Sequence, residues 1–160
     1  MMFCLTVGYS LQSTGATLCG QEIGKANVTS AKYYYRSVLI FQITISIFQA
    51  LGLQIFMGMI LDRISTDVNM QDTLVSIYPL FTFNVFLDSI RAMLKGFLRG
   101  LGTQNSVVPY HILIQGGVLP GAVFVLCFNM PSLSDQPVLG AWIAATICDF
   151  LLFLAYFVTL

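Results

Sequence analysis

The sequence predicts an all-α fold, a polytopic bundle of transmembrane helices. Of its 160 residues, 57% are hydrophobic and only 9% are charged, whereas a soluble domain carries about 25% charged residues. The mean hydropathy is +0.83. Backbone polar groups in lipid must be hydrogen-bonded within the chain, and the apolar runs lack the alternation of a barrel, so helices are expected. The composition therefore indicates an integral, multi-pass membrane protein.

Five apolar segments divide the chain, and each is close to the ~20 residues that a helix needs to cross the bilayer. The five predicted helices cover residues 1–18, 37–61, 74–94, 107–130 and 138–160. The first is the weakest, because Gly8, Gly15 and several serines and threonines interrupt it. Pro79 and Pro120 fall inside apolar segments, where a proline frees a backbone carbonyl and permits bending.

The charges on the connections alternate along the chain. Basic residues dominate the first connection and precede the third, whereas aspartates dominate the second and fourth; the basic residues are Lys25, Lys32, Arg36, Lys95 and Arg99. The positive-inside rule then places the first and third connections in the cytoplasm. With five spans, the N-terminus lies outside and the C-terminus inside. Because such a start lacks a signal sequence, we expect that a preceding helix is missing and that the chain is the C-terminal part of a longer protein.

A stripe of polar residues runs along the third predicted helix. At 100° per residue, its five members fall within an arc of about 80°; they are Asn84, Asp88, Arg91, Lys95 and Arg99. A charge near the bilayer centre costs about 2.5–3.5 kcal/mol, so such residues usually face the bundle interior and have a function. The stripe is the strongest sign of a functional site in the sequence.

Two acids in this chain are candidate ion sites. Asp88 is interpreted either as a proton or cation site or as the partner of Arg91 in an ion pair at i+3. Asp149, in the last predicted helix, is interpreted either as a second cation ligand or as a hydrogen-bonded acid with a partner such as Thr146. Lys95 is assigned, with the other basic residue at the end of the stripe, to the cytoplasmic interface, where long side chains reach water or lipid headgroups.

Several classes of function find no support. The seven basic residues are spread over the chain and form no patch for nucleic acid. The sequence contains no nucleophile–base pair, no phosphate-binding loop and no cluster with metal-ligand spacing, so neither an enzyme nor a cofactor is expected. His111, at the start of the fourth predicted helix, is interpreted as a polar cap.

Two motifs and two shorter matches resemble one family. The run GQEIGKANVTSAK, which begins at Gly20 and includes Glu22 and Gly24, is similar to the cytoplasmic signature of MATE (multidrug and toxic compound extrusion) transporters. It departs from that signature at Leu18 and Cys19. A second stretch resembles the family's P…D…GxLRGxGxQ pattern through Pro79, Asp88, Gly96, Leu98, Arg99, Gly100, Gly102 and Gln104. The pair Leu119-Pro120 and the triplet Gly140-Ala141-Trp142 match in the same order.

The resemblance implies a fold and a mechanism. The chain would correspond to helices 8–12 of a twelve-helix antiporter built from two six-helix lobes, with the N-terminal lobe and helix 7 absent. Such a transporter exports xenobiotics or organic cations in exchange for protons or sodium ions, as its lobes rock about a central cavity. By this resemblance Asp88 would be the coupling acid and could hold sodium. Asp149 is a candidate second coupling site on its own position in the last predicted helix. Asn84 and Arg91 would line the substrate cavity or support the ion pair.

Two alternatives stay open. The chain could be a truncated membrane fragment that packs against a partner and transports nothing by itself. It could also belong to a flippase of lipid-linked substrates in the same superfamily, for which a larger and more basic cavity is expected. The lipid bilayer is a partner in every case, and the sequence does not distinguish a plasma membrane from a vacuolar or vesicular one.

Overall fold

The computed structural model is helical throughout the part of the chain that it describes. It describes the backbone of residues 2–64, 67–130 and 137–160, and the side chains of these residues apart from 2–8 and 68–69. No strand occurs in these ranges. The prediction of an all-α bundle is confirmed.

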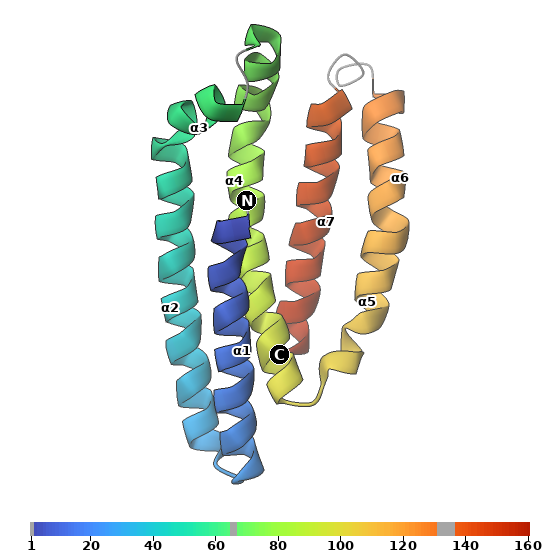
Figure 1. Ribbon diagram of the computed structural model, residues 1–160. Helices are drawn as coiled ribbons and strands as arrows, with labels where there is room; N and C mark the ends of the chain where they lie inside the picture. Colours follow the sequence, from blue (N-terminus) through green and yellow to red (C-terminus); the bar gives the residue numbers. More distant parts are fainter. Residues whose placement is uncertain (1, 65–66, 131–136) are drawn as a thin grey trace.

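The helices form five long rods, which lie side by side in the molecule (Figure 1). The first two are α1 (Met2–Gly24) and α2 (Val28–Ile55), and a short helix, α3 (Met57–Ile64), leads into the third, α4 (Val68–Gly100). The fourth rod stacks η1 (Gln104–Ser106), α5 (Val108–Leu113), η2 (Ile114–Val118), α6 (Leu119–Phe124) and η3 (Val125–Asn129); the fifth is α7 (Pro137–Thr159). The α1–α2 turn, the α4–η1 connection and the C-terminus lie at the same end of the bundle. This is the arrangement that the alternating charges require.

The helices do not end where the apolar segments end. α2 begins at Val28, nine residues before the predicted segment 37–61, and its first turn is capped by Asn27, whose side-chain oxygen accepts a hydrogen bond from the Ser30 amide at 3.2 Å. The same predicted segment is divided at Phe56 between α2 and α3. Hydropathy marks the part of a helix that lies in hydrocarbon, whereas the helical hydrogen bonds continue into the headgroup region.

Four helical stretches are long and apolar enough to cross a membrane within the described residues. They are Val28–Ile55, Met70–Gly100, Gln104–Asn129 and Pro137–Thr159. α1 has 23 residues, enough for a span by length, but it is not among the four, in keeping with the weak apolar signal of the first predicted segment. Large apolar side chains are exposed along the outer faces, for example Phe48 and Ile55 of α2. In a membrane these faces contact lipid.

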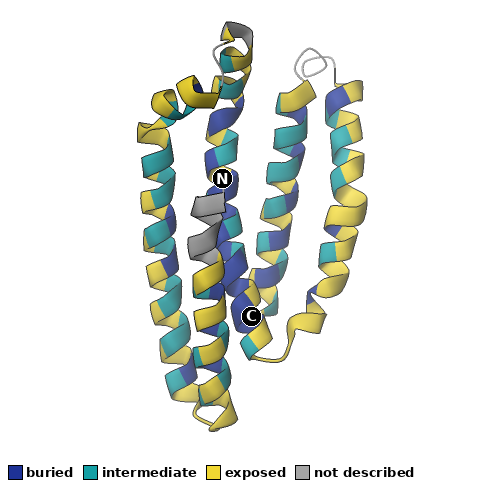
Figure 2. Cartoon of the chain, viewed as in Figure 1, coloured by how far each residue is buried: buried dark blue, intermediate teal, exposed yellow. Residues whose placement is uncertain are grey.

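α4 is the centre of the bundle. It packs against α1, α2 and α7, and Figure 2 shows its lower half as the most continuously buried part of the chain. Its side chains Met93, Leu94, Phe97 and Leu98 are at most 1% exposed. α7, which also packs against α4, has a buried residue at every fourth position, namely Gly140, Ala144, Cys148, Leu152 and Tyr156.

α1 and α4 approach each other at the level of the backbone. A β-carbon added to Gly100 would lie 2.6 Å from the carbonyl oxygen of Ala16, and one added to Gly96 would overlap the carbonyl oxygen of Gln12. Gly20 continues the contact, since its β-carbon would lie 3.4 Å from the Gly100 oxygen. The sequence Gly-x-x-x-Gly at 96–100 is therefore a helix-packing motif here.

The fourth rod differs from the others because it contains two π-helical turns, η2 and η3. In a π-helical turn the amide bonds to the carbonyl five residues back instead of four. Pro120, the second residue of α6, lies two positions after the last residue of the first of these turns and has no amide hydrogen to donate. The rod rests mainly on α7 and touches α4 through η1.

The close contact of α1 with α4 leads to a stability prediction. Gly100→Ala places a methyl group against the Ala16 carbonyl, so we expect a loss of about 1–3 kcal/mol in the free energy of unfolding. The matched control is Gly121→Ala in α6, where the added methyl group meets nothing within 4 Å. Thermal unfolding of the purified protein in detergent measures both. Equal melting temperatures for the two variants would contradict the proposed packing.

Candidate functional site

An arginine on α4 joins two carboxylates that come from different helices. Arg91 donates through Nη2 to Asp88 Oδ1, one turn back on α4, and through Nη1 to Asp149 Oδ1 of α7 at 2.7 Å. The Asp88–Arg91 pair is the ion pair that the i, i+3 spacing predicted. The link from Arg91 to Asp149 was not predicted, because a contact between residues 58 positions apart leaves no trace in spacing along one helix.

The cluster is shielded from solvent and carries unequal charges. The side chains of Arg91, Asp88 and Asp149 are 16%, 23% and 21% exposed. Charge-assisted hydrogen bonds of this kind are about twice as strong as neutral ones. One guanidinium faces two carboxylates, so the cluster keeps one negative charge when all three groups are ionised. It can therefore accept a proton or a small cation.

A second polar link between the same helices lies one turn away. Asn84 donates through Nδ2 to Thr146 Oγ1 at 2.9 Å, and the Thr146 hydroxyl in turn donates to the Trp142 carbonyl at 2.8 Å. Thr146 is thus the partner of Asn84, and the expectation that it pairs with Asp149 is wrong. The threonine hydroxyl is used in this chain of hydrogen bonds, whereas the carboxylate of Asp149 reaches the stronger donor, Arg91.

Asn84 also has an oxygen with no partner. Its Oδ1 atom is buried and accepts no hydrogen bond from the described residues, and the residue as a whole is 7% exposed. An unsatisfied buried oxygen costs about 1–3 kcal/mol. Because Asn84 precedes Asp88 by four residues, both lie on the same face of α4. This places a neutral oxygen that can act as a cation ligand one helical turn from the carboxylate of Asp88.

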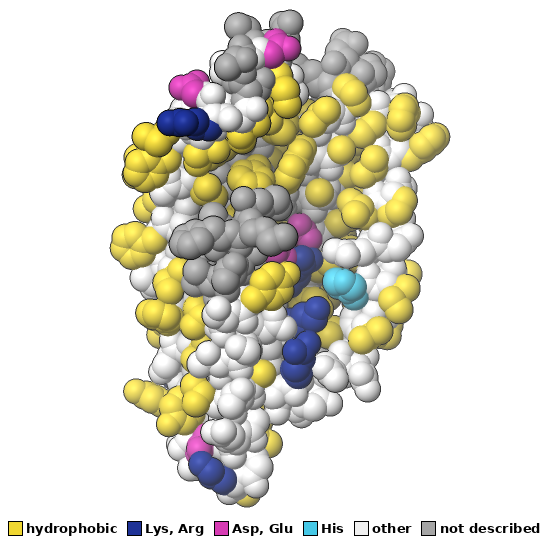
Figure 3. All heavy atoms as spheres, viewed as in Figure 1, with side chains coloured by type: hydrophobic (Ala, Val, Ile, Leu, Met, Phe, Trp, Pro, Cys, Tyr) yellow, Lys and Arg dark blue, Asp and Glu magenta, His cyan; other side chains and the backbone are white. Residues whose placement is uncertain are grey.

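The remaining charges of the stripe lie nearer the end of α4. Lys95 and Arg99 are exposed, and neither forms a salt bridge with a described residue. Figure 3 shows basic side chains in a column on this face, with acidic side chains at its upper end and the histidine beside it. That histidine, His111, is the fourth residue of α5 and not its cap; it lines a hollow of about 280 Å³ together with Lys95.

The signature residues of the first connection lie close to those of α4. Glu22, in the last turn of α1, forms a salt bridge at 2.8 Å with Lys25, just after the helix, and Gly20 faces Gly100. Gly24 ends α1, and its surroundings are open. The two motifs that are far apart in the sequence therefore meet at one end of the bundle.

Comparison with known proteins identifies the family. The sequence model of the MatE family matches residues 1–118, well over half of the chain. The chain belongs to the MatE family. Members of this family are transporters, so this MatE protein is an integral, multi-pass membrane protein and not an enzyme. The resemblance that the two motifs indicated is confirmed.

A solved structure has the same fold as this MatE protein. It is described as the inward-facing conformation of a multidrug resistance MATE family transporter of the MOP superfamily; the TM-score is 0.86 at 13% sequence identity. The match covers 98% of this chain and 34% of the transporter's chain, so this chain spans about one third of that protein. No curated protein sequence matches the chain.

The bridge between α4 and α7 leads to a prediction about stability. Arg91→Gln leaves two carboxylates without their shared donor, and we expect it to lower the free energy of unfolding by about 1.5–3 kcal/mol, the range for hydrogen bonds to charged groups. Lys95→Gln, one turn further along α4, removes the same charge without breaking a salt bridge and is the control.

A double-mutant cycle tests the bridge directly. Arg91→Gln and Asp149→Asn should be clearly non-additive in thermal unfolding, because each removes the same interaction. Additive effects would show that the two side chains do not interact in the folded protein.

Proposed function

We propose that this chain is the C-terminal lobe of an antiporter that exports organic cations or xenobiotics in exchange for protons or sodium ions. Its helices α1, α2, α4, the rod from η1 to η3, and α7 would be helices 8–12 of twelve. The family membership, the matching fold and the coverage of about one third of a MATE transporter support this assignment. Transport would then require the N-terminal lobe and helix 7 in addition to these helices.

The observation that carries the proposal is the Arg91 bridge with its surplus negative charge. An internal guanidinium can act as the counter-ion of Asp88 until a proton or sodium ion replaces it. Asp88 would then be neutralised by the coupling ion, while Arg91 stays with Asp149. The bridge is thus an element with two states, and an ion that binds one state more tightly shifts the equilibrium between them.

Coupling requires that this ion affinity differ between the inward-facing and outward-facing arrangements of the lobes. The bridge spans α4 and α7, so its geometry depends on how these two helices pack. An organic cation is attracted by the same surplus negative charge. Binding of the substrate in one arrangement and of the coupling ion in the other gives exchange without simultaneous occupancy.

The free oxygen of Asn84 bears on which ion couples. Sodium prefers several oxygen ligands, and Asn84 Oδ1 is a buried oxygen one turn from Asp88 that accepts no hydrogen bond from the described part of the chain. It would complete a site for sodium at Asp88, whereas a proton needs the carboxylate alone. The net negative charge of the cluster also favours cation exchange over a flippase for lipid-linked substrates, for which a more basic cavity is expected.

The test is ion-driven efflux by the complete transporter in vesicles. Asp88→Asn removes the charge that the coupling ion neutralises, so we expect efflux driven by a sodium or proton gradient to fall by about tenfold or more, which corresponds to a typical coupling free energy. Asp62→Asn on the exposed face of α3 is the matched control and should keep wild-type efflux. Unchanged ion-driven efflux in Asp88→Asn would refute the assignment of the site.

A second variant separates the two coupling ions. Asn84→Ala removes the neutral oxygen and leaves the carboxylates in place. If sodium binds at Asp88, efflux driven by a sodium gradient at equal pH should fall in Asn84→Ala, whereas efflux driven by a pH gradient without sodium should stay. An equal response of the two modes would refute the role of Asn84 as a sodium ligand.

A further inference from the structure

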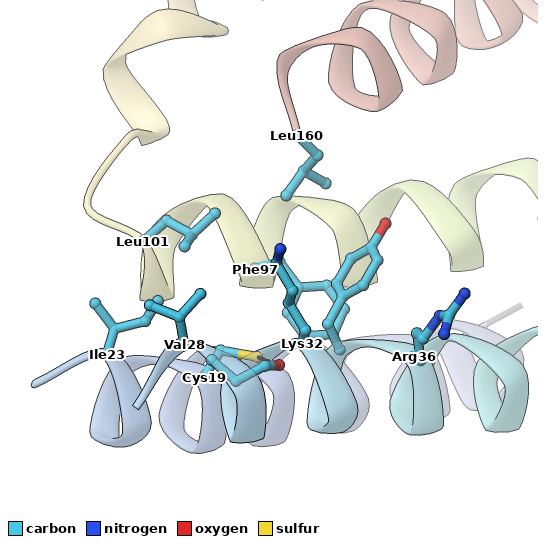
Figure 4. A pocket seen from close by; sticks show the side chains of 10 residues that line it. Cys19, Ile23, Val28, Lys32, Arg36, Phe97, Leu101 and Leu160 are labelled. Atoms are coloured by element: carbon cyan, nitrogen blue, oxygen red, sulfur yellow. Dashed lines mark hydrogen bonds between the residues drawn. The ribbon is translucent and has the colours of Figure 1, made fainter. Parts of the chain in front are cut away.

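A hollow of about 520 Å³ lies at the end of the bundle where α1 turns into α2. Its walls come from the end of α1, the start of α2, the end of α4 and the last residue of the chain (Figure 4). Most of the wall is apolar and includes Ile23, Leu101 and Leu160. The Asp88–Arg91–Asp149 cluster is not part of this hollow.

Two cations of α2, Lys32 and Arg36, stand on the wall of this hollow. They are one helical turn apart on the same face of α2, both are exposed, and neither forms a salt bridge with a described residue. The acid in the neighbouring turn, Glu22, is already paired with Lys25 at 2.8 Å. The hollow therefore presents two positive charges that pair with no acidic side chain among the residues that the structure describes.

An apolar stripe of α2 continues directly from the two cations. At 100° per residue, Ile40, Ile43 and Ile47 lie within about 40° of Arg36 around the helix. Ile40 is 65% exposed and Ile47 is 45% exposed. The stripe extends about 16 Å along the axis from Arg36 to Ile47. Charge at the end of the bundle, followed by exposed isoleucines toward its middle, is the order of groups in a phospholipid.

We propose that this hollow and stripe bind one anionic phospholipid of the cytoplasmic leaflet. Its phosphate accepts hydrogen bonds from Arg36 and Lys32, because guanidinium and ammonium groups are the usual donors to phosphate. The phosphate lies at the wall of the hollow, the glycerol follows it beside Arg36, and one acyl chain lies along Ile40 and Ile47. The basic α1–α2 connection faces the cytoplasm by the positive-inside rule, and the anionic lipids of that leaflet attract such residues.

Competition between two lipids tests the proposal. The purified protein in detergent receives an equimolar mixture of dioleoyl phosphatidylglycerol and dioleoyl phosphatidylcholine, and native mass spectrometry counts the bound lipids. We expect wild type to retain the anionic lipid, and Lys32→Gln/Arg36→Gln to weaken that preference by about tenfold. Lys25→Gln/Arg63→Gln removes the same two charges outside the hollow and should keep the preference.

Two further measurements complete the test: one uses a variant that conserves both charges, and the other adds inorganic phosphate as a soluble competitor. Lys32→Arg/Arg36→Lys keeps both charges and should retain the lipid, so a loss seen only in the glutamine variant is not a failure to fold. Equal binding of the two lipids by wild type, or an equal loss in the Lys25/Arg63 control, would overturn the site. Displacement of the lipid by inorganic phosphate alone would overturn the assignment to a lipid.

The apolar half of the site has its own control. Ile40→Ser/Ile47→Ser should weaken retention of the anionic lipid, whereas Phe48→Ser, at an exposed position about 120° away on α2, should not. Equal retention by both variants would overturn the acyl-chain position. The site is independent of Asp88, so its failure would leave the coupling proposal untouched.

Discussion

The backbone contact between α1 and α4 sets the position of the other helices. At Gly96 and Gly100 the two helices are so close that no β-carbon fits between α4 and the carbonyls of Gln12 and Ala16. Without a hydrophobic drive between helices in lipid, such close packing is a main source of association. α2 and α7 then pack against α4 around this contact. The central position of α4 brings its charged stripe within reach of α7.

The polar links between α4 and α7 have a different energetic character. Close glycine packing is insensitive to ions, and so is the neutral link through Asn84, whereas the link through Arg91 depends on the charges of Asp88 and Asp149. The contact of α1 with α4 is made by glycines and backbone atoms. The contact of α4 with α7 contains the ionisable side chains Asp88, Arg91 and Asp149.

The sequence predicts the features that depend on one helix at a time. Apolar segments predict the rods, and the i, i+3 spacing predicts the Asp88–Arg91 pair. Features that depend on two helices are out of reach: the bridge to Asp149 requires knowing how α4 faces α7, and the role of Thr146 was predicted wrongly for the same reason. Helix ends were also misjudged, because hydropathy reports the thickness of the hydrocarbon and not the extent of helical hydrogen bonding.

The two π-helical turns of the fourth rod have a mechanical consequence. Each holds its residues in a wider loop than an α-helical turn, so conversion of one to α-helix would rotate everything beyond it by about one residue, or about 100°. For η2 the part beyond it is α6, which rests on α7. Such a rotation would change which residues α6 presents to α7. The turns η2 and η3 are thus the two places at which the helical register of this rod could change by one residue.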